Sequence, residues 1–257
     1  MIDPDPSTTA PATLDPEWSE LVDDDRGILL RRVVVGPLRT NCYVITSIPG
    51  QQSIVVDPGD DAAAILDAVA DVDVGLIVLT HAHFDHVQAL AEVAETLGAP
   101  IAAHPDDAPV WPHELDHLHR YGHFDAGTAT ADLLAAGCSL CPPPAQPPWD
   151  GRVDRLLRHG DVINVDRLAI ATLHTPGHTP GGLSLHLPGQ VLTGDTLFPG
   201  GPGLTGWPLS DFTTILESIE HILLTLPPAT IVHPGHGHPT TISTELPHLT
   251  GWAARGW

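Results

Sequence analysis

The chain has 257 residues, 42% of them hydrophobic, a length that suits one globular domain with a sizeable core. It carries 32 acidic side chains against ten basic ones, all arginine, and its formal charge is −22. Such a surface repels phosphate backbones and anionic lipids, so we expect a small-molecule substrate, with neither nucleic acid nor membrane as a partner.

The location of the protein is predicted from what the sequence lacks. Its first twenty residues contain neither the basic nor the apolar segment of a secretory signal. No apolar run approaches the roughly 18 residues that a spanning helix needs. The three cysteines, Cys42, Cys138 and Cys141, cannot all pair within the chain. We therefore expect a cytoplasmic protein without a disulfide framework.

The first half of the chain is expected to alternate between strands and helices. Residues 1–25 are rich in proline, aspartate and threonine and predict a disordered or loosely packed acidic arm. From Ile28 onwards, β-branched runs bounded by turn residues are typical of strands, and longer periodic runs are typical of helices. The expected elements are strands at 28–36, 41–47, 53–59, 74–80 and 100–104, with helices at 61–70 and 86–98.

The rhythm breaks at about residues 106–150, where five prolines fall within 142–148. This stretch predicts an irregular insertion, a lid or flap rather than a second domain. Beyond it we expect strands at 161–165, 167–177, 183–187, 191–196 and 230–237, and an amphipathic helix at 210–226. The pattern indicates a single layered α/β domain over residues 26–257.

The densest group of metal-binding side chains is the run THAHFDH at 80–86, which follows a buried strand. His81 and His83 are two apart in extended backbone, so both can face the same side. Asp85 and His86 come as the chain turns into the next helix. Imidazole nitrogen and carboxylate oxygen together suit zinc, iron or manganese. The run therefore predicts a metal site.

Three later stretches also place metal-binding side chains where a strand becomes a Gly/Pro loop. They are HTPGHTPGG (174–182), LTGDT (192–196) and HPGHGH (233–238). Sheet folds assemble their sites from such strand-end loops. We expect these loops to meet the THAHFDH segment.

This ordered set of motifs resembles the metallo-β-lactamase superfamily, and within it the glyoxalase II-like hydrolases. TNCYV (40–44) and VVDPGD (55–60) match that group as well. The resemblance implies a four-layer αβ/βα sandwich with two divalent metal ions, zinc foremost, at one edge between the sheets. It also implies hydrolysis of a thioester or ester by a hydroxide that bridges the two metals.

The resemblance carries over to the following positions. His81, His83 and His178 would hold the first metal, and Asp85, His86 and His236 the second. Asp195 would bridge both, and Asp85 would orient the nucleophile. Asp57 would accept an N–H from a ligand histidine and so fix its tautomer. His174, His233 and His238 flank these positions and are not expected to be ligands.

Departures from the family pattern bear on the substrate. Glyoxalase II enzymes carry a G-C-G-R-T-D segment after the bridging aspartate, where this chain reads LFPGGPGLTGWPLSDF (197–212), and the chain has no lysine. A glutathione thioester is therefore not the favoured substrate. Asp195 argues against lactam hydrolysis, because β-lactamases of this fold lack it. The alternatives are a persulfide dioxygenase, whose single iron would bind at His81, His178 and Asp195, and a lactonase.

The insertion offers further candidates. His113 and His117 would share one face if this stretch were helical. The Cys138–Cys141 pair cannot complete a tetrahedral zinc site alone.

Trp111 and Trp207 are expected in loops at the rim of the site, where they would contact substrate.

Overall fold

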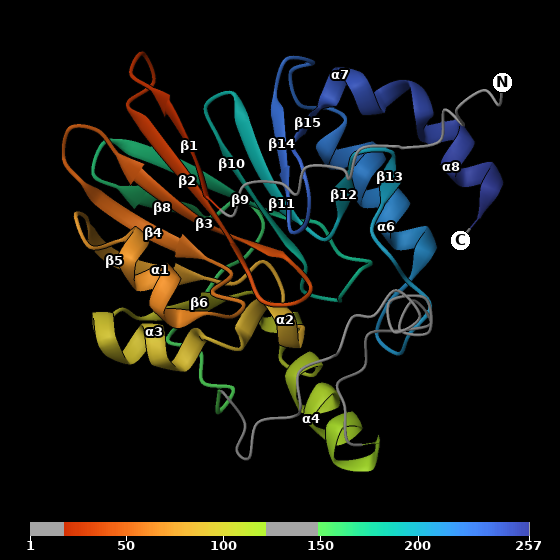
Figure 1. The fold of residues 1–257 in the computed structure, drawn as a ribbon. Helices are drawn as coiled ribbons and strands as arrows, with labels where there is room; N and C mark the ends of the chain where they lie inside the picture. Colours follow the sequence, from red (N-terminus) through yellow and green to blue (C-terminus); the bar gives the residue numbers. More distant parts are fainter. Residues whose placement is uncertain (1–17, 122–148, 257) are drawn as a thin grey trace, which may run out of the picture.

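A computed structural model describes residues 18–121 and 149–256. Two large β-sheets pack face to face, with helices on their outer faces (Figure 1). Cys138 and Cys141 lie outside the described residues. Within these ranges, no helix is long and apolar enough to cross a membrane.

The first sheet has seven strands in chain order, and its carboxyl-terminal half is parallel because β4, β5, β6 and β7 run in one direction. Its strands are β1 (Trp18–Asp23), β2 (Ile28–Val35), β3 (Thr40–Ser47), β4 (Gln52–Val56), β5 (Asp73–Val78), β6 (Ile101–Ala103) and β7 (Arg155–Leu156).

The second sheet has six strands in the order β15-β14-β11-β10-β9-β8. They are β8 (Val162–Val165), β9 (Leu168–His174), β10 (Leu183–Leu187), β11 (Gln190–Gly194), β14 (Ile231–Pro234) and β15 (Thr240–Thr241). A small hairpin, β12 (Leu197–Phe198) with β13 (Gly201–Pro202), follows β11.

The helical segments are short. They are α1 (Ala62–Ala68), α2 (Phe84–Val87), α3 (Leu90–Leu97), η1 (Pro105–Asp107), α4 (Val110–Tyr121), α6 (Phe212–Ser218), the π-helical turn η2 (Ile219–Leu223), α7 (Ile242–Glu245), η3 (Leu246–His248) and α8 (Leu249–Arg255).

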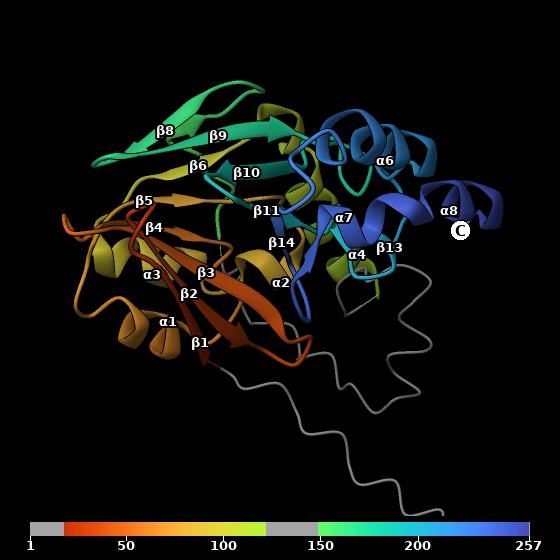
Figure 2. The same ribbon diagram turned by 90° about the horizontal axis from the view of Figure 1, so that it is seen from above.

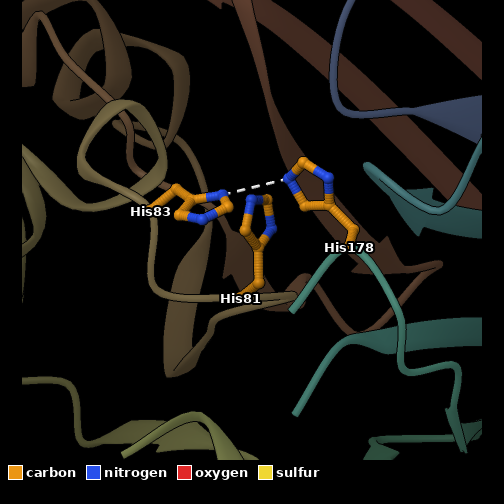
Figure 3. A group of neighbouring side chains, drawn as sticks. All are labelled: His81, His83 and His178. Atoms are coloured by element: carbon orange, nitrogen blue, oxygen red, sulfur yellow. Dashed lines mark hydrogen bonds between the residues drawn. The ribbon is translucent and has the colours of Figure 1, made fainter. Parts of the chain in front are cut away.

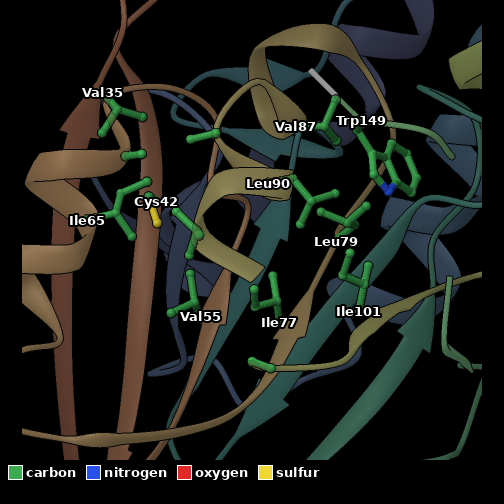
Figure 4. Close-up of a cluster of buried hydrophobic side chains, with 14 of the residues drawn as sticks. Val35, Cys42, Val55, Ile65, Ile77, Leu79, Val87, Leu90, Ile101 and Trp149 are labelled. Carbon is green, nitrogen blue, oxygen red and sulfur yellow. The ribbon is translucent and has the colours of Figure 1, made fainter. Parts of the chain in front are cut away.

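Three buried clusters account for the four layers seen from above in Figure 2. Between the sheets, Ile54 and Val56 face the apolar side chains of the second sheet. Val55, one residue along, points the opposite way and packs under α1 and α3 (Figure 4). On the far side, Ile215 and its neighbours cover the second sheet. The predicted αβ/βα sandwich is confirmed.

Two segments differ from the sequence-based predictions because backbone pairing outweighs the side-chain pattern. The predicted arm over 1–25 is wrong for residues 18–23, which form the edge strand β1 against β2. Its Leu21 and Val22 are exposed, so no buried face reveals the strand. The predicted helix 86–98 starts earlier and is broken, because the amides of Gln88 and Ala89 donate to carbonyls of the 58–59 loop.

The predicted irregular insertion is also partly wrong. Its first part contains the twelve-residue helix α4, which begins at Val110, the fifth residue of the stretch. His113 and His117 lie on this helix, one turn apart, as the spacing allowed. Later in the chain, Asp211 caps α6 by accepting the Thr214 amide at 2.7 Å, and the predicted helix 210–226 is realised as α6 continued by η2.

Candidate metal centre

The seven predicted ligands come together at one edge of the sandwich, each on a segment that follows a strand. His81 and His83 follow β5, Asp85 and His86 lie in α2, and His178 lies between β9 and β10. Asp195 follows β11, and His236 follows β14. β4 is parallel to β5 and β11 to β14, so their carboxyl ends open towards this edge.

The first group contains three histidines whose nitrogens point inward (Figure 3). The Nδ1 of His83 lies 3.0 Å from the Nε2 of His178. The His81 ring stands nearly perpendicular to both, with centroids 4.8 Å from each. Three imidazoles from two sheets thus converge on one point.

The second group contains Asp85, His86 and His236. The Nε2 of His236 lies 3.2 Å from Asp85 Oδ2, and the Nε2 of His86 lies 3.6 Å from the same oxygen. His236, rather than its neighbour His238, makes these contacts.

Asp195 reaches both groups. One of its oxygens lies 3.7 Å from His178 Nε2 and 3.4 Å from His236 Nε2, and the other lies 3.5 Å from His86 Nε2. Gly235 makes this approach possible, because a Cβ there would lie 2.0 Å from Asp195 Oδ1.

Hydrogen bonds at the outer nitrogens set the histidine tautomers. Asp57 is buried and accepts His86 Nδ1–H at 2.9 Å, the Thr80 hydroxyl at 2.6 Å and the Thr80 amide at 2.7 Å. With its proton committed to Asp57, the Thr80 oxygen accepts His81 Nδ1–H at 3.0 Å. One carboxylate therefore leaves the Nε2 lone pairs of His81 and His86 facing the site.

Backbone carbonyls do the same for His178 and His236. His178 Nδ1–H donates to the Leu204 carbonyl at 2.7 Å, and His236 Nδ1–H donates to the Leu38 carbonyl at 3.0 Å. Their Nε2 atoms are thus left as acceptors that point inward.

These residues fit a pair of metal ions. His81 Nε2, His86 Nε2 and Asp195 Oδ1 are buried and have no hydrogen-bond partner among the described residues, which is costly unless another group binds them. Neighbouring inward-facing atoms are 3.0–3.7 Å apart. Ligands at about 2.0–2.1 Å from a tetrahedral metal would be about 3.4 Å apart. Zinc, iron and manganese all accept such nitrogen and carboxylate donors.

The charge state also suits cations. Burial and the nearby His86 hold the pKa of His81 well below its usual value, so its imidazole is neutral. Burial opposes ionisation of Asp85 and Asp195, but the neighbouring histidines outweigh it and lower the pKa of both carboxyls. Conversely, burial disfavours the charged form of His86, but the surrounding carboxylates raise its pKa to about 9. The carboxylates thus concentrate negative charge at the site. A bound metal cation can balance this charge in place of the protons on the histidines.

A cavity of about 420 Å³ opens onto this cluster. His83, Asp85, His178, Asp195 and His236 form its polar floor. Its walls are mostly apolar and comprise Leu38, Phe84, the 198–204 hairpin segment, Trp207 and, as a cation, Arg255.

The two tryptophans predicted to contact substrate differ. Trp207 lines the cavity and meets the His83 and His178 rings edge-on at 5.5 and 4.9 Å. The prediction for Trp111 is wrong, because its side chain is only 2% exposed, sits in the core under α4 and donates to the Trp149 carbonyl at 3.0 Å. A rim position was inferred from an irregular loop, whereas the segment is a packed helix.

Several supporting residues were not identified from the sequence. The Thr40 hydroxyl donates to Asp85 Oδ2 at 3.0 Å. The Asn41 amide side chain and the Tyr43 hydroxyl both donate to the Pro234 carbonyl and so hold the loop that carries His236. TNCYV was noticed only as a family match, although its alternating polar side chains at a strand start were a usable signal. Asp107, after the strand PIAAH, was missed altogether.

Two of the three histidines that were set aside, His174 and His233, make contacts away from the cluster. His174 stacks on His104 with ring centroids 3.9 Å apart and hydrogen-bonds the Pro180 carbonyl. His233 hydrogen-bonds Gln190 at 2.9 Å in the interior. His104, Asp106 and His174 form another compact group, but the two rings are parallel within 10°. A single ion cannot lie in both ring planes, so this arrangement does not suit a metal.

Comparison with known proteins agrees with this geometry. Bacillus subtilis YqgX, described as a probable metallo-hydrolase, is 34% identical over 230 residues, which is 87% of this chain and 98% of YqgX. Haemophilus influenzae GloC, a hydroxyacylglutathione hydrolase, is 28% identical over 218 residues, which is 83% of this chain and 92% of GloC.

Two crystal structures have the same fold. TTHA1623, in a di-iron-bound form, is 34% identical with a TM-score of 0.63, covering 84% of this chain and 96% of its own. BLEG-1, described as a B3 metallo-beta-lactamase, is 30% identical with a TM-score of 0.65, covering 85% and 97%. The profile of the metallo-beta-lactamase superfamily matches residues 35–236, a span that includes all seven clustered side chains. The chain belongs to the metallo-beta-lactamase superfamily.

Proposed function

We propose that this protein is a metal-dependent hydrolase that cleaves a thioester or ester of a small molecule. The observation that carries the proposal is the position of Asp195, whose two oxygens reach both ligand groups while the residue also lines the cavity. A carboxylate can share its oxygens between two cations. A floor built in this way would let two bound ions act together on one substrate.

His81, His83 and His178 would hold one ion, Asp85, His86 and His236 the other, and Asp195 both. When bound there, two divalent ions would lower the pKa of a water to about 7 and stabilise the oxyanion that forms at the substrate carbonyl.

The attacking group is a water molecule. Among the described residues that line the cavity, none carries a hydroxyl, thiol or amine that could form an acyl-enzyme. Asp85 is held in place by the Thr40 hydroxyl and by His236, so its carboxylate can orient the water through a hydrogen bond. The water oxygen bonds to the carbonyl carbon, the C–S or C–O bond breaks, and an acid and a thiol or alcohol leave.

The cavity walls favour a substrate with an apolar portion. Phe84, Phe198 and Trp207 offer aromatic surface, and Arg255 adds a single positive charge at the wall. GloC acts on a hydroxyacylglutathione, but this chain lacks lysine and the G-C-G-R-T-D segment. Thioesters with a smaller or more apolar thiol are therefore expected to be better substrates than glutathione thioesters. The charge of −22 disfavours nucleic-acid substrates.

The test is turnover by protein loaded with zinc, iron or manganese. The panel comprises apolar thioesters, a glutathione thioester, aryl esters, lactones and a β-lactam, with Asp195→Asn as the comparison variant. We expect hydrolysis of a thioester or ester that falls at least 100-fold in the variant, since the bridging charge is lost. No hydrolysis of any thioester or ester by protein carrying two ions would refute the proposal.

Oxygen uptake with a low-molecular-weight persulfide, and one iron per chain, would instead support the dioxygenase alternative. That outcome would leave Asp85, His86 and His236 without a metal to bind.

A further inference from the structure

The two halves of the first histidine group come from different sheets. His81 and His83 follow β5 of the first sheet, whereas His178 lies between β9 and β10 of the second. Their ligand atoms must nevertheless be placed within a few tenths of an ångström to bind one ion. Something must therefore fix the two loops relative to each other.

Asp107, the last residue of η1, lies between these two loops. Asp107 is buried, with only 3% of its surface exposed. Oδ2 accepts the amide of Ala82 at 2.6 Å, and Oδ1 accepts the amide of Gly181 at 2.9 Å. Ala82 separates the two loop histidines of the first sheet, and Gly181 is three residues beyond His178.

The fit at Gly181 is close. A Cβ at this position would lie 2.4 Å from the Asp107 amide nitrogen and 2.6 Å from its Cβ. The loop is also rigid in itself, since Thr175 donates to the Gly182 carbonyl at 2.7 Å and Gly177 to the Thr179 carbonyl at 2.9 Å. A displacement of Gly181 would therefore move His178 with it.

From these contacts we propose that Asp107 is a positioning residue that sets the separation between the His81–His83 segment and His178, and so pre-organises the first metal site. Among the described residues, those that line the cavity and those that form the candidate metal groups do not include Asp107, and each of its oxygens accepts a backbone amide. The backbone bond from Leu183 to the Thr80 carbonyl, at 2.8 Å, joins the same two regions and supports the same alignment. The inference rests on the proposed function only in assuming that the three histidines bind an ion.

Only a carboxylate fits this role. Two donors face two acceptor oxygens, whereas the amide of asparagine would turn an N–H against one of the donors. Asp107→Asn should therefore release one loop while the volume of the side chain is preserved. Asp106→Asn is the matched control, because its side chain is 60% exposed and makes neither contact.

The first experiment measures the two stepwise zinc-binding constants by chelator competition, which does not depend on any substrate. In Asp107→Asn we expect one constant to weaken about 10–100-fold and the other to change less than threefold. The control should change neither. Unchanged constants in folded Asp107→Asn, or an equal loss at both sites, would overturn the proposal.

The second experiment needs no variant and decides the matter if Asp107→Asn does not fold. Amide hydrogen exchange is measured on metal-free wild-type protein. The amides of Ala82 and Gly181 should be strongly protected before any ion binds. Exchange of either amide at the rate of an unstructured peptide would overturn the proposal.

Discussion

Asp57→Asn tests how the tautomers of the metal-site histidines are set. In the wild type, Asp57 accepts from His86 Nδ1–H and from both donors of Thr80. Asparagine can keep one oxygen for the Thr80 amide, but its NH₂ group then faces His86. To accept that hydrogen bond, His86 must carry its proton on Nε2, the nitrogen that faces the site.

The magnitude follows from the contact that is lost. A hydrogen bond to a charged group contributes about 1.5–3 kcal/mol. The geometry of this one, 2.9 Å with both side chains at most 2% exposed, places it in that range. Removing it should weaken binding of the ion held by His86 by about 10–100-fold. Loss of a residue that orients a metal ligand typically weakens metal binding by about this factor.

The assay is zinc competition against a chelator, with circular dichroism of the metal-free variant to establish that it is folded. Asp67→Asn removes the same charge from an exposed position on α1 and should bind zinc like the wild type. Folded Asp57→Asn that binds both ions with wild-type affinity would show that the tautomer argument is incorrect.

Other side chains give further predictions. Trp111→Phe should lower the free energy of unfolding by about 1–3 kcal/mol, because a buried carbonyl loses its donor, and should leave kcat/KM unchanged. Trp207→Phe should raise KM and leave the free energy of unfolding unchanged. The reverse pattern would refute the placement of Trp111 in the core and of Trp207 in the cavity wall. Burial lowers the pKa of His233 from 6.5 to about 4. The neutral His233 therefore contributes about 3 kcal/mol to the free energy of unfolding above pH 6.5, and this contribution is lost as the pH falls towards 4. Chemical unfolding between pH 7 and 4 should show a shallower decline for His233→Gln, and parallel curves would contradict this. Gly235→Ala places a Cβ 2.0 Å from Asp195 Oδ1 and should reduce the zinc content of purified, folded protein; full occupancy would contradict the close approach.

Side-chain patterns predicted most of the fold. β-branched runs bounded by turns located the strands that have two buried faces, such as β3 and β4. β1 was missed because its Leu21 and Val22 are exposed and only its backbone pairs. The helix after THAHFDH was expected to be continuous, since nothing in the local sequence reveals that distant carbonyls capture the amides of Gln88 and Ala89.

The site shows the same division. The positions of the seven clustered side chains were predictable because each lies on a segment that follows a strand and matches a family motif. The role of Asp107 could not be predicted, because its partners are backbone amides 25 and 74 residues away along the chain. Every residue except proline has a backbone amide, so the side-chain pattern does not reveal such a contact. Trp111 was misplaced for a related reason: proline-rich sequence around it suggested a loop, whereas tertiary packing stabilises α4.

The central claim is that this cluster holds two ions with Asp195 between them. Anomalous diffraction from crystals of the metal-loaded protein tests it most directly, since it locates each ion and identifies the element. We expect two peaks about 3.5–4 Å apart, one among His81, His83 and His178 and the other beside His86 and His236. A single iron peak at the first group, with the second group unoccupied at saturating metal, would contradict the claim.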